Sequence, residues 1–196
     1  MKPFSEACER NRDPILAVLR QWVIAPGTVL EIGAGTGQHA VHFAGALPHL
    51  RWVATDVEQN HPGIAAWIEE SALTNVSGPI TLDVRDPDWP FSSLHYAYSA
   101  NTAHIMSWDA VTHMFGGVSR VLRRRGLFFL YGPFNRNGKF TSESNREFDE
   151  SLRARDSSMG VRDDQALIAL ARSCELSYAA DYSMPARNRL LIWQKE

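Results

Sequence analysis

Glu31, Gly33, Gly35 and Gly37 form the part of this chain whose residue types and spacing are best suited to chemistry. They follow an apolar run and precede a helical pattern, which predicts a strand, a glycine turn and a helix in succession. Glycine adopts backbone angles closed to other residues and lets a ligand approach closely. The free N–H groups at the start of the helix would point to the same place. The segment therefore predicts a small-molecule pocket.

The spacing of the glycines favours one kind of nucleotide over another. The dinucleotide pattern G-x-G-x-x-G would need a glycine at Gln38, and Glu31 would repel a pyrophosphate. S-adenosylmethionine carries an ammonium and a sulfonium and no phosphate, so it suits an acidic site. The pattern E-x-G-x-G-x-G resembles motif I of the class I methyltransferases. The alternative at this point is a glycine turn that holds no ligand.

Length, composition and charge are those of an ordinary globular protein. The 196 residues predict a single domain, residues 1–196, with a full core. A net charge of -2 does not favour a nucleic-acid partner, and no apolar stretch is long enough to predict a membrane span. Cys8 and Cys174 are far apart and match no metal pattern, which predicts a reduced, cytoplasmic protein without a metal site.

Strand and helix patterns alternate along most of the chain. This order predicts an α/β fold with a doubly wound, mostly parallel seven-stranded sheet. The short connection between residues 177–183 and 189–194 predicts a C-terminal antiparallel hairpin. Asp13-Pro14 predicts the start of the first helix. Residues 80–84 predict the third strand, and residues 108–124 a helix whose basic end is Arg123-Arg124-Arg125.

Polar residues that follow the predicted strands are the candidates for holding the cofactor, because open parallel sheets bind ligands beyond their carboxyl ends. Asp56 would accept hydrogen bonds from the ribose, unless it only caps its loop. Asp83 and Val84 would contact the adenine, with Asp86 as a weaker rival. Asn101 would contact the methionine part of the cofactor.

Two further residues near predicted strand ends could meet the methyl acceptor. Tyr131 is the best single candidate to touch it, and His104 is either a catalytic base or a histidine in the wall of the pocket. The N/D-P-P-Y motif of enzymes that methylate amino groups on DNA bases or glutamine is absent from the sequence, which disfavours those substrates.

Two segments are predicted to cover the pocket. An N-terminal cap, residues 1–12, contains Phe4 and Arg10; Arg10 would pair with the carboxylate of the cofactor or make a surface salt bridge. An insert of residues 133–163 is too long for an ordinary connection and predicts a lid. Phe134, Asn145 and Arg155 in this insert are candidates for contact with a small, partly polar acceptor.

Several flanking segments resemble one family over nearly the whole chain. They are KPFSEACERN (2–11), ANTAHI (100–105), YGPF (131–134), FTSESN (140–145), RD (155–156), GVRD (160–163) and MPA (184–186). Together they resemble the domain-of-unknown-function family 938, the methyltransferase-like 26 type. The resemblance implies a class I methyltransferase fold and S-adenosylmethionine binding. Arg187 stands where that family is expected to have asparagine, which could alter acceptor preference if the loop borders the pocket.

The sequence thus predicts an S-adenosylmethionine-dependent methyltransferase that transfers the methyl group in line to an unidentified small molecule. Such a reaction depends mainly on alignment and exclusion of water, so no particular catalytic residue is required. The alternatives are a protein that binds the cofactor without transferring methyl and a nucleotide-dependent oxidoreductase. A protein acceptor is also open, and the sequence does not predict an oligomeric state.

Overall fold

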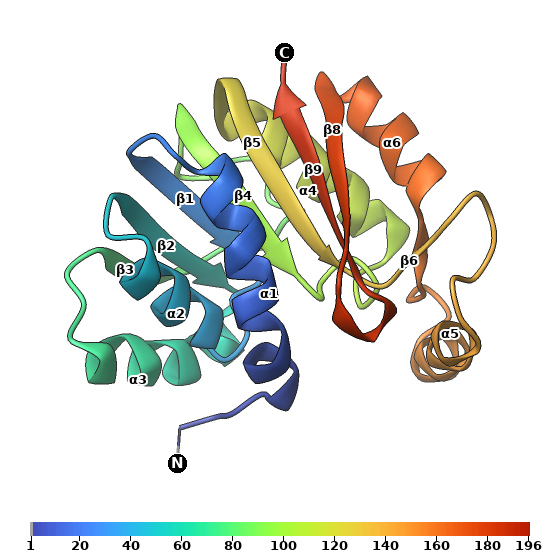
Figure 1. Cartoon of the computed structure of the whole chain (residues 1–196), viewed down its shortest axis with the longest axis horizontal. Helices are drawn as coiled ribbons and strands as arrows, with labels where there is room; N and C mark the ends of the chain where they lie inside the picture. The colour runs from blue at the N-terminus through green and yellow to red at the C-terminus, as the bar shows by residue number, and fades with distance from the viewer. Residues whose placement is uncertain (1) are drawn as a thin grey trace.

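One twisted sheet forms the centre of the molecule, and helices cover both of its faces (Figure 1). The computed structural model describes residues 2–196. The seven strands lie in the order β3-β2-β1-β4-β5-β9-β8. They are β1 (Gly27–Ile32), β2 (Leu50–Asp56), β3 (Val76–Thr81), β4 (Leu94–Ala100), β5 (Leu122–Gly132), β8 (Leu176–Ser183) and β9 (Arg189–Lys195). The α-helices are α1 (Glu6–Trp22), α2 (Gln38–Ala46), α3 (His61–Ser71), α4 (Trp108–Val121), α5 (Glu143–Arg155) and α6 (Asp164–Ser173).

The pairing of the strands confirms the predicted fold class. Strands β1 to β5 pair in parallel, whereas β9 runs antiparallel to both β5 and β8. The turn between β8 and β9 contains a short 3-10 helix, η2 (Pro185–Arg187), and is too short for a parallel crossover. A doubly wound sheet therefore ends in an antiparallel hairpin, as the sequence predicts.

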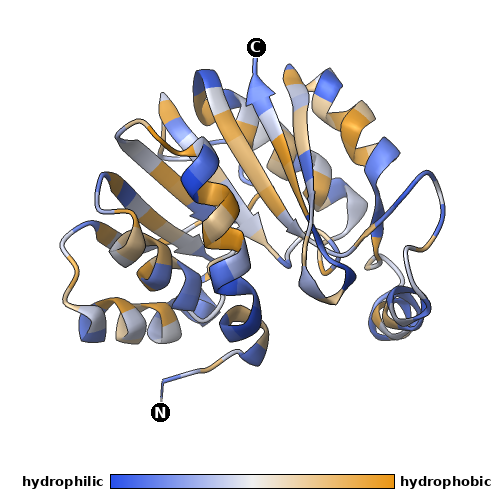
Figure 2. Ribbon diagram, in the orientation of Figure 1, coloured by the Kyte–Doolittle hydropathy of each residue, from blue (hydrophilic) through white to orange (hydrophobic). Residues whose placement is uncertain are grey.

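The central strands are buried on both faces because successive side chains point to opposite sides of the sheet. Val29 and Phe129 pack in the cluster that also contains side chains of α1, α2 and α3. Their neighbours Leu30 and Phe128 pack in the opposite cluster, with side chains of α4 and α6. Apolar residues accordingly follow one another along the middle strands in Figure 2.

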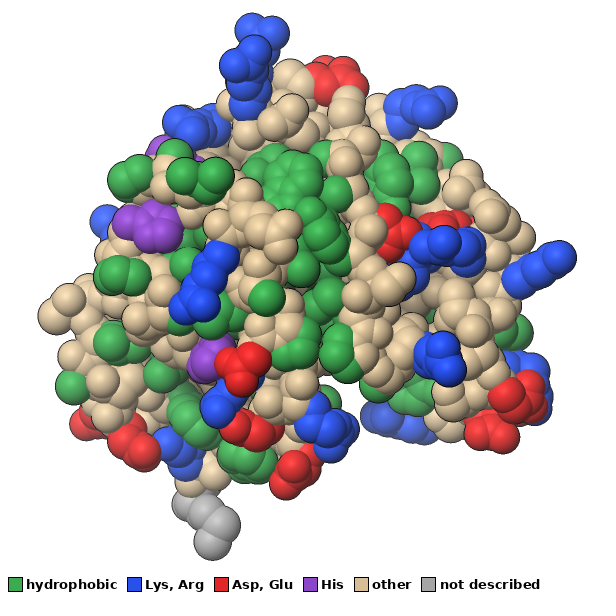
Figure 3. Space-filling model, in the orientation of Figure 1, with side chains coloured by type: hydrophobic (Ala, Val, Ile, Leu, Met, Phe, Trp, Pro, Cys, Tyr) green, Lys and Arg blue, Asp and Glu red, His purple; other side chains and the backbone are tan. Residues whose placement is uncertain are grey.

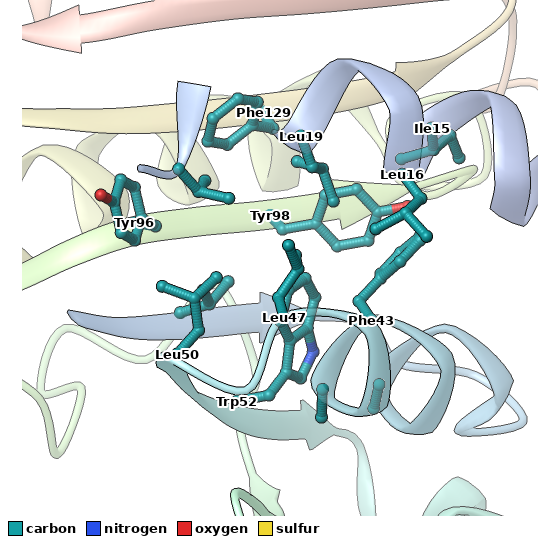
Figure 4. Close-up of a cluster of buried hydrophobic side chains, with 14 of the residues drawn as sticks. Ile15, Leu16, Leu19, Phe43, Leu47, Leu50, Trp52, Tyr96, Tyr98 and Phe129 are labelled. Carbon is teal, nitrogen blue, oxygen red and sulfur yellow. The ribbon is translucent and has the colours of Figure 1, made fainter. Parts of the chain in front are cut away.

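Aromatic rings occupy part of the first of these clusters, between α2 and the sheet (Figure 4). Phe43 of α2 lies with its ring centroid 5.3 Å from Trp52 of β2 and 5.5 Å from Tyr98 of β4. All three side chains are fully buried. Their packing joins α2 to two strands of the sheet and so fixes the position of the glycine turn that precedes α2.

The first helix begins earlier than Asp13-Pro14, so that prediction is wrong. The hydroxyl of Ser5 accepts a hydrogen bond from Cys8 N at 3.3 Å and caps α1, and Pro14 lies inside the helix. Ser5 and Asp13 are equally good capping residue types, and the acidic first turn at Glu6 and Glu9 supports the earlier start. Most of the predicted N-terminal cap is therefore the first two turns of α1.

Two other predicted boundaries also differ from the structure. Strand β3 ends at Thr81 and contains Gly78-Pro79. It can contain a proline because it lies at the edge of the sheet, where a residue without an N–H need not cost a ladder bond. Helix α4 ends at Val121, so Arg123-Arg124-Arg125 are exposed residues of β5 and do not form the end of a helix.

The predicted insert contains its own small structure. Strand β6 (Phe134–Asn135) precedes α5 in the chain and pairs in parallel with β7 (Arg162–Asp163), which follows α5. Figure 1 shows α5 at the right, below the carboxyl ends of the main strands.

Among the helices of residues 2–196, none combines the length and the apolar character needed to cross a bilayer.

Candidate functional site

A cleft of about 920 Å³ lies at the carboxyl ends of β1, β2, β4 and β5. Its walls come from the N-terminal turns of α1, the glycine turn, the β4–α4 loop, α5 and the turn between β8 and β9. In the space-filling view the lower edge of the molecule is indented between the α1 side and the α5 side (Figure 3). The volume is at the upper end of the range of roughly 300–1,000 Å³ for small-molecule sites.

The three glycines of the turn after β1 have positive φ angles of +72°, +60° and +88° at Gly33, Gly35 and Gly37. Gly35 lines the cleft, and a Cβ placed on it would meet no atom within 4 Å. Gly37 faces away from the cleft, and a Cβ there would lie 2.9 Å from the Cα of Ile64 in α3. Gly35 therefore leaves room for a ligand, whereas Gly37 allows α3 to pack closely.

Glu31 places a buried carboxylate at the floor of the cleft. Its Oε2 accepts a hydrogen bond of 2.7 Å from the indole Nε1 of Trp52. Burial raises the pKa of Glu31 to about 8; the bond from Trp52 lowers it, and the negative charge of Asp56 raises it further. A positively charged ligand group in the cleft would offset the cost of ionising this side chain.

Asp56, at the end of β2, holds the glycine turn from the adjacent strand. Its Oδ2 accepts a hydrogen bond of 2.7 Å from Gly35 N. Its Oδ1 accepts from Val57 N at 2.8 Å and from Asn60 Nδ2 at 2.9 Å. A carboxylate has about four acceptor positions, so Oδ2 can take a further bond from a ligand hydroxyl.

The N-terminal segment crosses this side of the cleft and is attached at two places. Ser5 N donates to Gln38 Oε1 at 2.6 Å, and the indole Nε1 of Trp67 donates to Pro3 O at 2.8 Å. Arg10, on the following helix α1, lines the cleft. A ligand carboxylate in the cleft could therefore reach Arg10, as the sequence predicts.

Three candidates from strands β4 and β5 also line the cleft. Asn101 has a positive φ of +59°, and its N–H donates to Tyr131 O at 2.9 Å, which ties the ends of the two strands together. The Tyr131 hydroxyl accepts a hydrogen bond of 2.9 Å from Asn188 Nδ2. His104 is 7% exposed, and burial lowers its pKa to about 4, with a further contribution from Arg162.

From the insert, Asn145 reaches the cleft and the other two candidates do not. Asn145 lines it from α5, and its Nδ2 donates to Thr141 Oγ1 at 2.8 Å. Phe134 is 1% exposed and packs in the core, and Arg155 is exposed at the end of α5. In the N-terminal segment Phe4 is 56% exposed and does not line the cleft.

The structure does not bring Asp83 or Val84 to the cleft. Since β3 ends at Thr81, both lie in the loop beyond it: the Asp83 carboxylate pairs with Arg85 at 2.7 Å, and Val84 is buried in the core on the other face of the sheet. The bond from Arg85 lowers the pKa of Asp83. Neither residue is part of the lining of the cleft.

Several lining residues were not assigned a role at the site from the sequence. They are Asn60 after β2, Asn11 and His39 in helices, Phe148 in α5, and Asn188 in the turn between β8 and β9. Asn60 and Asn188 carry a weak signal, because each is a polar residue in a loop at the carboxyl edge of the sheet. His39 looks like any histidine of a buried helix face, and nothing local distinguishes it.

Within residues 2–196 no group of three or more histidine, cysteine or carboxylate side chains is arranged to hold a metal ion.

The family model described as "Protein of unknown function (DUF938)" matches residues 2–195. The chain belongs to this family. The match covers the residues of the cleft together with the rest of the chain, as the resemblance in the sequence predicts.

Several solved structures share the fold of this chain at low sequence identity. An O-methyltransferase family protein from Burkholderia thailandensis aligns with a TM-score of 0.82 at 14% identity, over 94% of this chain and 56% of that one. PigF with SAH gives 0.79 at 14%, over 93% and 61%. YcgJ from Bacillus subtilis gives 0.74 at 16%, over 94% and 99%. The DUF938 chain thus spans little more than half the length of the first two proteins, and it shares a methyltransferase-like fold with all three.

Proposed function

We propose that this DUF938 protein binds S-adenosylmethionine and transfers its methyl group to a small molecule. The observation that supports this most strongly is the pair of carboxylates at the ends of adjacent parallel strands, Glu31 on β1 and Asp56 on β2, beside the open backbone of Gly35. These groups offer negative charge and hydrogen-bond acceptors at the point where an open parallel sheet binds ligands.

The donor and acceptor groups of this half of the cleft fit S-adenosylmethionine. Glu31 is buried with a raised pKa and accepts only the Trp52 indole, so a cationic group nearby would stabilise its ionised form. A pyrophosphate in the same place would add negative charge beside two carboxylates. The charge of the site therefore favours a cationic nucleoside over a dinucleotide.

Individual residues have distinct roles in this proposal. Asp56 accepts a hydrogen bond from the ribose, Arg10 pairs with the carboxylate of the methionine part, and Gly35 allows close approach of the backbone. When bound, the cofactor supplies an electrophilic methyl group on a sulfonium. The chain contributes alignment and exclusion of water, since a sulfonium leaving group needs no further activation.

The half of the cleft beyond β4 and β5 would receive the acceptor. Tyr131, His104 and Asn145 line it, together with the ring of Phe148. The large cleft and its mixture of apolar and amide groups support a small molecule. Among the proteins with this fold, one from Planctomyces limnophilus is an O-methyltransferase family 2 protein in complex with apigenin, at a TM-score of 0.80 and 13% identity.

Calorimetric titration tests the cofactor directly. Purified protein is titrated in parallel with S-adenosylmethionine, S-adenosylhomocysteine and NAD. We expect dissociation constants on the order of micromolar for the first two and no heat of binding for NAD. Binding of NAD alone, or of none of the three, would contradict the proposal.

A second experiment separates methyl transfer from mere binding of the cofactor. Protein incubated with S-adenosylmethionine carrying an isotopically labelled methyl group and with a mixture of small neutral metabolites should release S-adenosylhomocysteine and labelled products. Binding without any turnover across such mixtures would favour a non-catalytic S-adenosylmethionine-binding protein.

A further inference from the structure

The charges that line the cleft are confined to the half assigned to the cofactor. Of the described residues that line it, only Arg10, Glu31 and Asp56 are of the types that normally carry charge. The proposed function assigns all three to S-adenosylmethionine, and any acceptor preference deduced from the remaining residues rests on that function. The segments that line the other half, around 100–106, 131–133, 144–148 and 185–188, contribute only uncharged side chains to the lining.

His104 offers that half an uncharged hydrogen-bonding group. The side chain is more than nine-tenths buried, and Arg162 adds to the effect of burial on its pKa, so the imidazole is neutral at pH 7. Within residues 2–196 neither ring nitrogen has a hydrogen-bond partner. The ring packs edge-on against Phe148 at 5.2 Å between centroids, and its backbone oxygen accepts from Gly160 N at 2.9 Å. A positioned polar group without a partner beside a cleft is suited to binding a ligand.

Tyr131 offers the same half a directed O–H donor. Its oxygen accepts from Asn188 Nδ2 at 2.9 Å, and this bond lowers the pKa of Tyr131 against the larger effect of burial. Within residues 2–196 no side chain or carbonyl accepts the hydroxyl proton, so that proton is free to point toward a ligand.

Tyr131 and His104 both line this half of the cleft. The Nδ1 of His104 lies 3.7 Å from the position of a Cβ built on Gly132, which points to the opposite face of the sheet from the Tyr131 side chain. The two polar groups therefore offer separate hydrogen-bonding positions within one cleft.

We propose that the acceptor half of the cleft binds an electrically neutral, partly apolar molecule through a hydroxyl group that accepts a hydrogen bond from Tyr131. A carboxylate, phosphate or ammonium in that position would lose its water without gaining a counter-charge. Burying an unpaired charge is costly, so charged analogues should bind roughly 100-fold more weakly or worse. The site thus selects against charged acceptors as well as for a hydroxyl.

The test uses three fluorinated probes of similar size: 4-fluorophenol, 4-fluorobenzoate and 4-fluorobenzylamine. Each is titrated by fluorine NMR into protein saturated with S-adenosylhomocysteine, after calorimetry has shown that this nucleoside binds. We expect 4-fluorophenol to bind and the two charged probes to show no binding at matched concentrations. Absence of 4-fluorophenol binding up to its solubility limit, or equal binding of a charged probe, would overturn the proposal.

Two matched variants locate the bound probe. Tyr131→Phe removes only the hydroxyl and should weaken 4-fluorophenol binding about tenfold, the loss of one hydrogen bond. Tyr96→Phe removes a hydroxyl that bonds to Ala25 O outside the cleft and should leave it unchanged. Equal binding to both variants would overturn the role of Tyr131. Failure of the nucleoside to bind at all would instead contradict the proposed function, which separates the two conclusions.

Discussion

The carboxylate of Glu31 on β1 accepts the indole N–H of Trp52 on β2, with 2.7 Å between Oε2 and Nε1. Both side chains are almost completely buried. Among the described residues this is the one hydrogen bond that the Glu31 side chain makes. A single neutral donor does not replace the water lost on burial, and the pKa of Glu31 accordingly rises to about 8. At neutral pH the Glu31 carboxyl group is therefore more stable protonated than ionised when no cation is bound.

Glu31→Gln should change how stability depends on pH. Between the ordinary pKa of 4.5 and about 8, the folded protein keeps a proton that the unfolded chain has released. The free energy of unfolding of the wild type therefore falls as pH rises, by up to about 1.4 kcal/mol per pH unit. Glutamine stays neutral, so the stability of the variant relative to wild type should increase steadily from about pH 5 to pH 8. Urea denaturation without ligand measures both.

Titrations of other groups are common to both proteins and cancel in this comparison. Glu58→Gln is the control, since Glu58 is exposed in the short 3-10 helix that follows β2. A difference between wild type and Glu31→Gln that stays constant with pH would show that Glu31 is ionised in the folded protein.

Asp56→Ala should weaken the binding of S-adenosylmethionine. The substitution removes the proposed bond to the ribose and the bond from Gly35 N that shapes the turn. Loss of a hydrogen bond to a charged acceptor corresponds to roughly 1–3 kcal/mol of binding free energy. Calorimetry against Asp83→Ala provides the comparison, because Asp83 pairs with Arg85 outside the cleft and its replacement should leave binding unchanged. The reverse ranking would restore Asp83 to the adenine site.

Gly35→Ala and Gly37→Ala should separate binding from stability. Each substitution forces a positive φ on alanine, which costs roughly 1–2 kcal/mol. At position 37 the added methyl group would also press on the Cα of Ile64 at 2.9 Å, adding about 1–3 kcal/mol of overpacking. At position 35 the methyl group would meet no protein atom and would project toward the ligand. Denaturation should thus show the larger loss for Gly37→Ala, and calorimetry the larger loss of affinity for Gly35→Ala.

The fold could be predicted from the sequence because its strongest signals are local. Apolar runs such as that of β5, and the short connection before Arg189, define parallel strands and a hairpin without tertiary information. Boundaries were less predictable. Ser5 and Asp13 compete as caps with the same chemistry, and Pro79 looks like a strand breaker unless β3 is known to be the edge strand.

The residues of the candidate site also divide into those that local sequence signals predict and those that they do not. Four of the candidates, Glu31, Asp56, Asn101 and Tyr131, lie in the last two positions of a strand or directly after it. The carboxyl edge of a parallel sheet collects such residues in one place. Asp83 does not line the cleft, because β3 ends two residues before it and its carboxylate pairs with Arg85 in the loop. Residues brought by packing, such as Asn11, Phe148 and Asn188, depend on how α1, α5 and the C-terminal hairpin dock. No local pattern encodes that docking.

Arg162→Met should destabilise the protein, whereas Arg155→Met should not. The guanidinium of Arg162, on β7, donates to Ala103 O at 3.0 Å, to Ser158 O at 2.9 Å and to Met106 O. Methionine keeps much of the apolar volume but leaves these buried carbonyls without a donor, at a cost of roughly 2–4 kcal/mol.

Arg155 is an exposed arginine at the end of α5, so its replacement by methionine should change the free energy of unfolding by less than about 0.5 kcal/mol. Urea denaturation of the two variants makes the comparison. Equal stabilities would mean that the insert does not depend on Arg162 to hold the β4–α4 loop. The fluorine NMR titration on Arg155→Met tests its predicted contact with the acceptor, and unchanged 4-fluorophenol binding would remove Arg155 from that role.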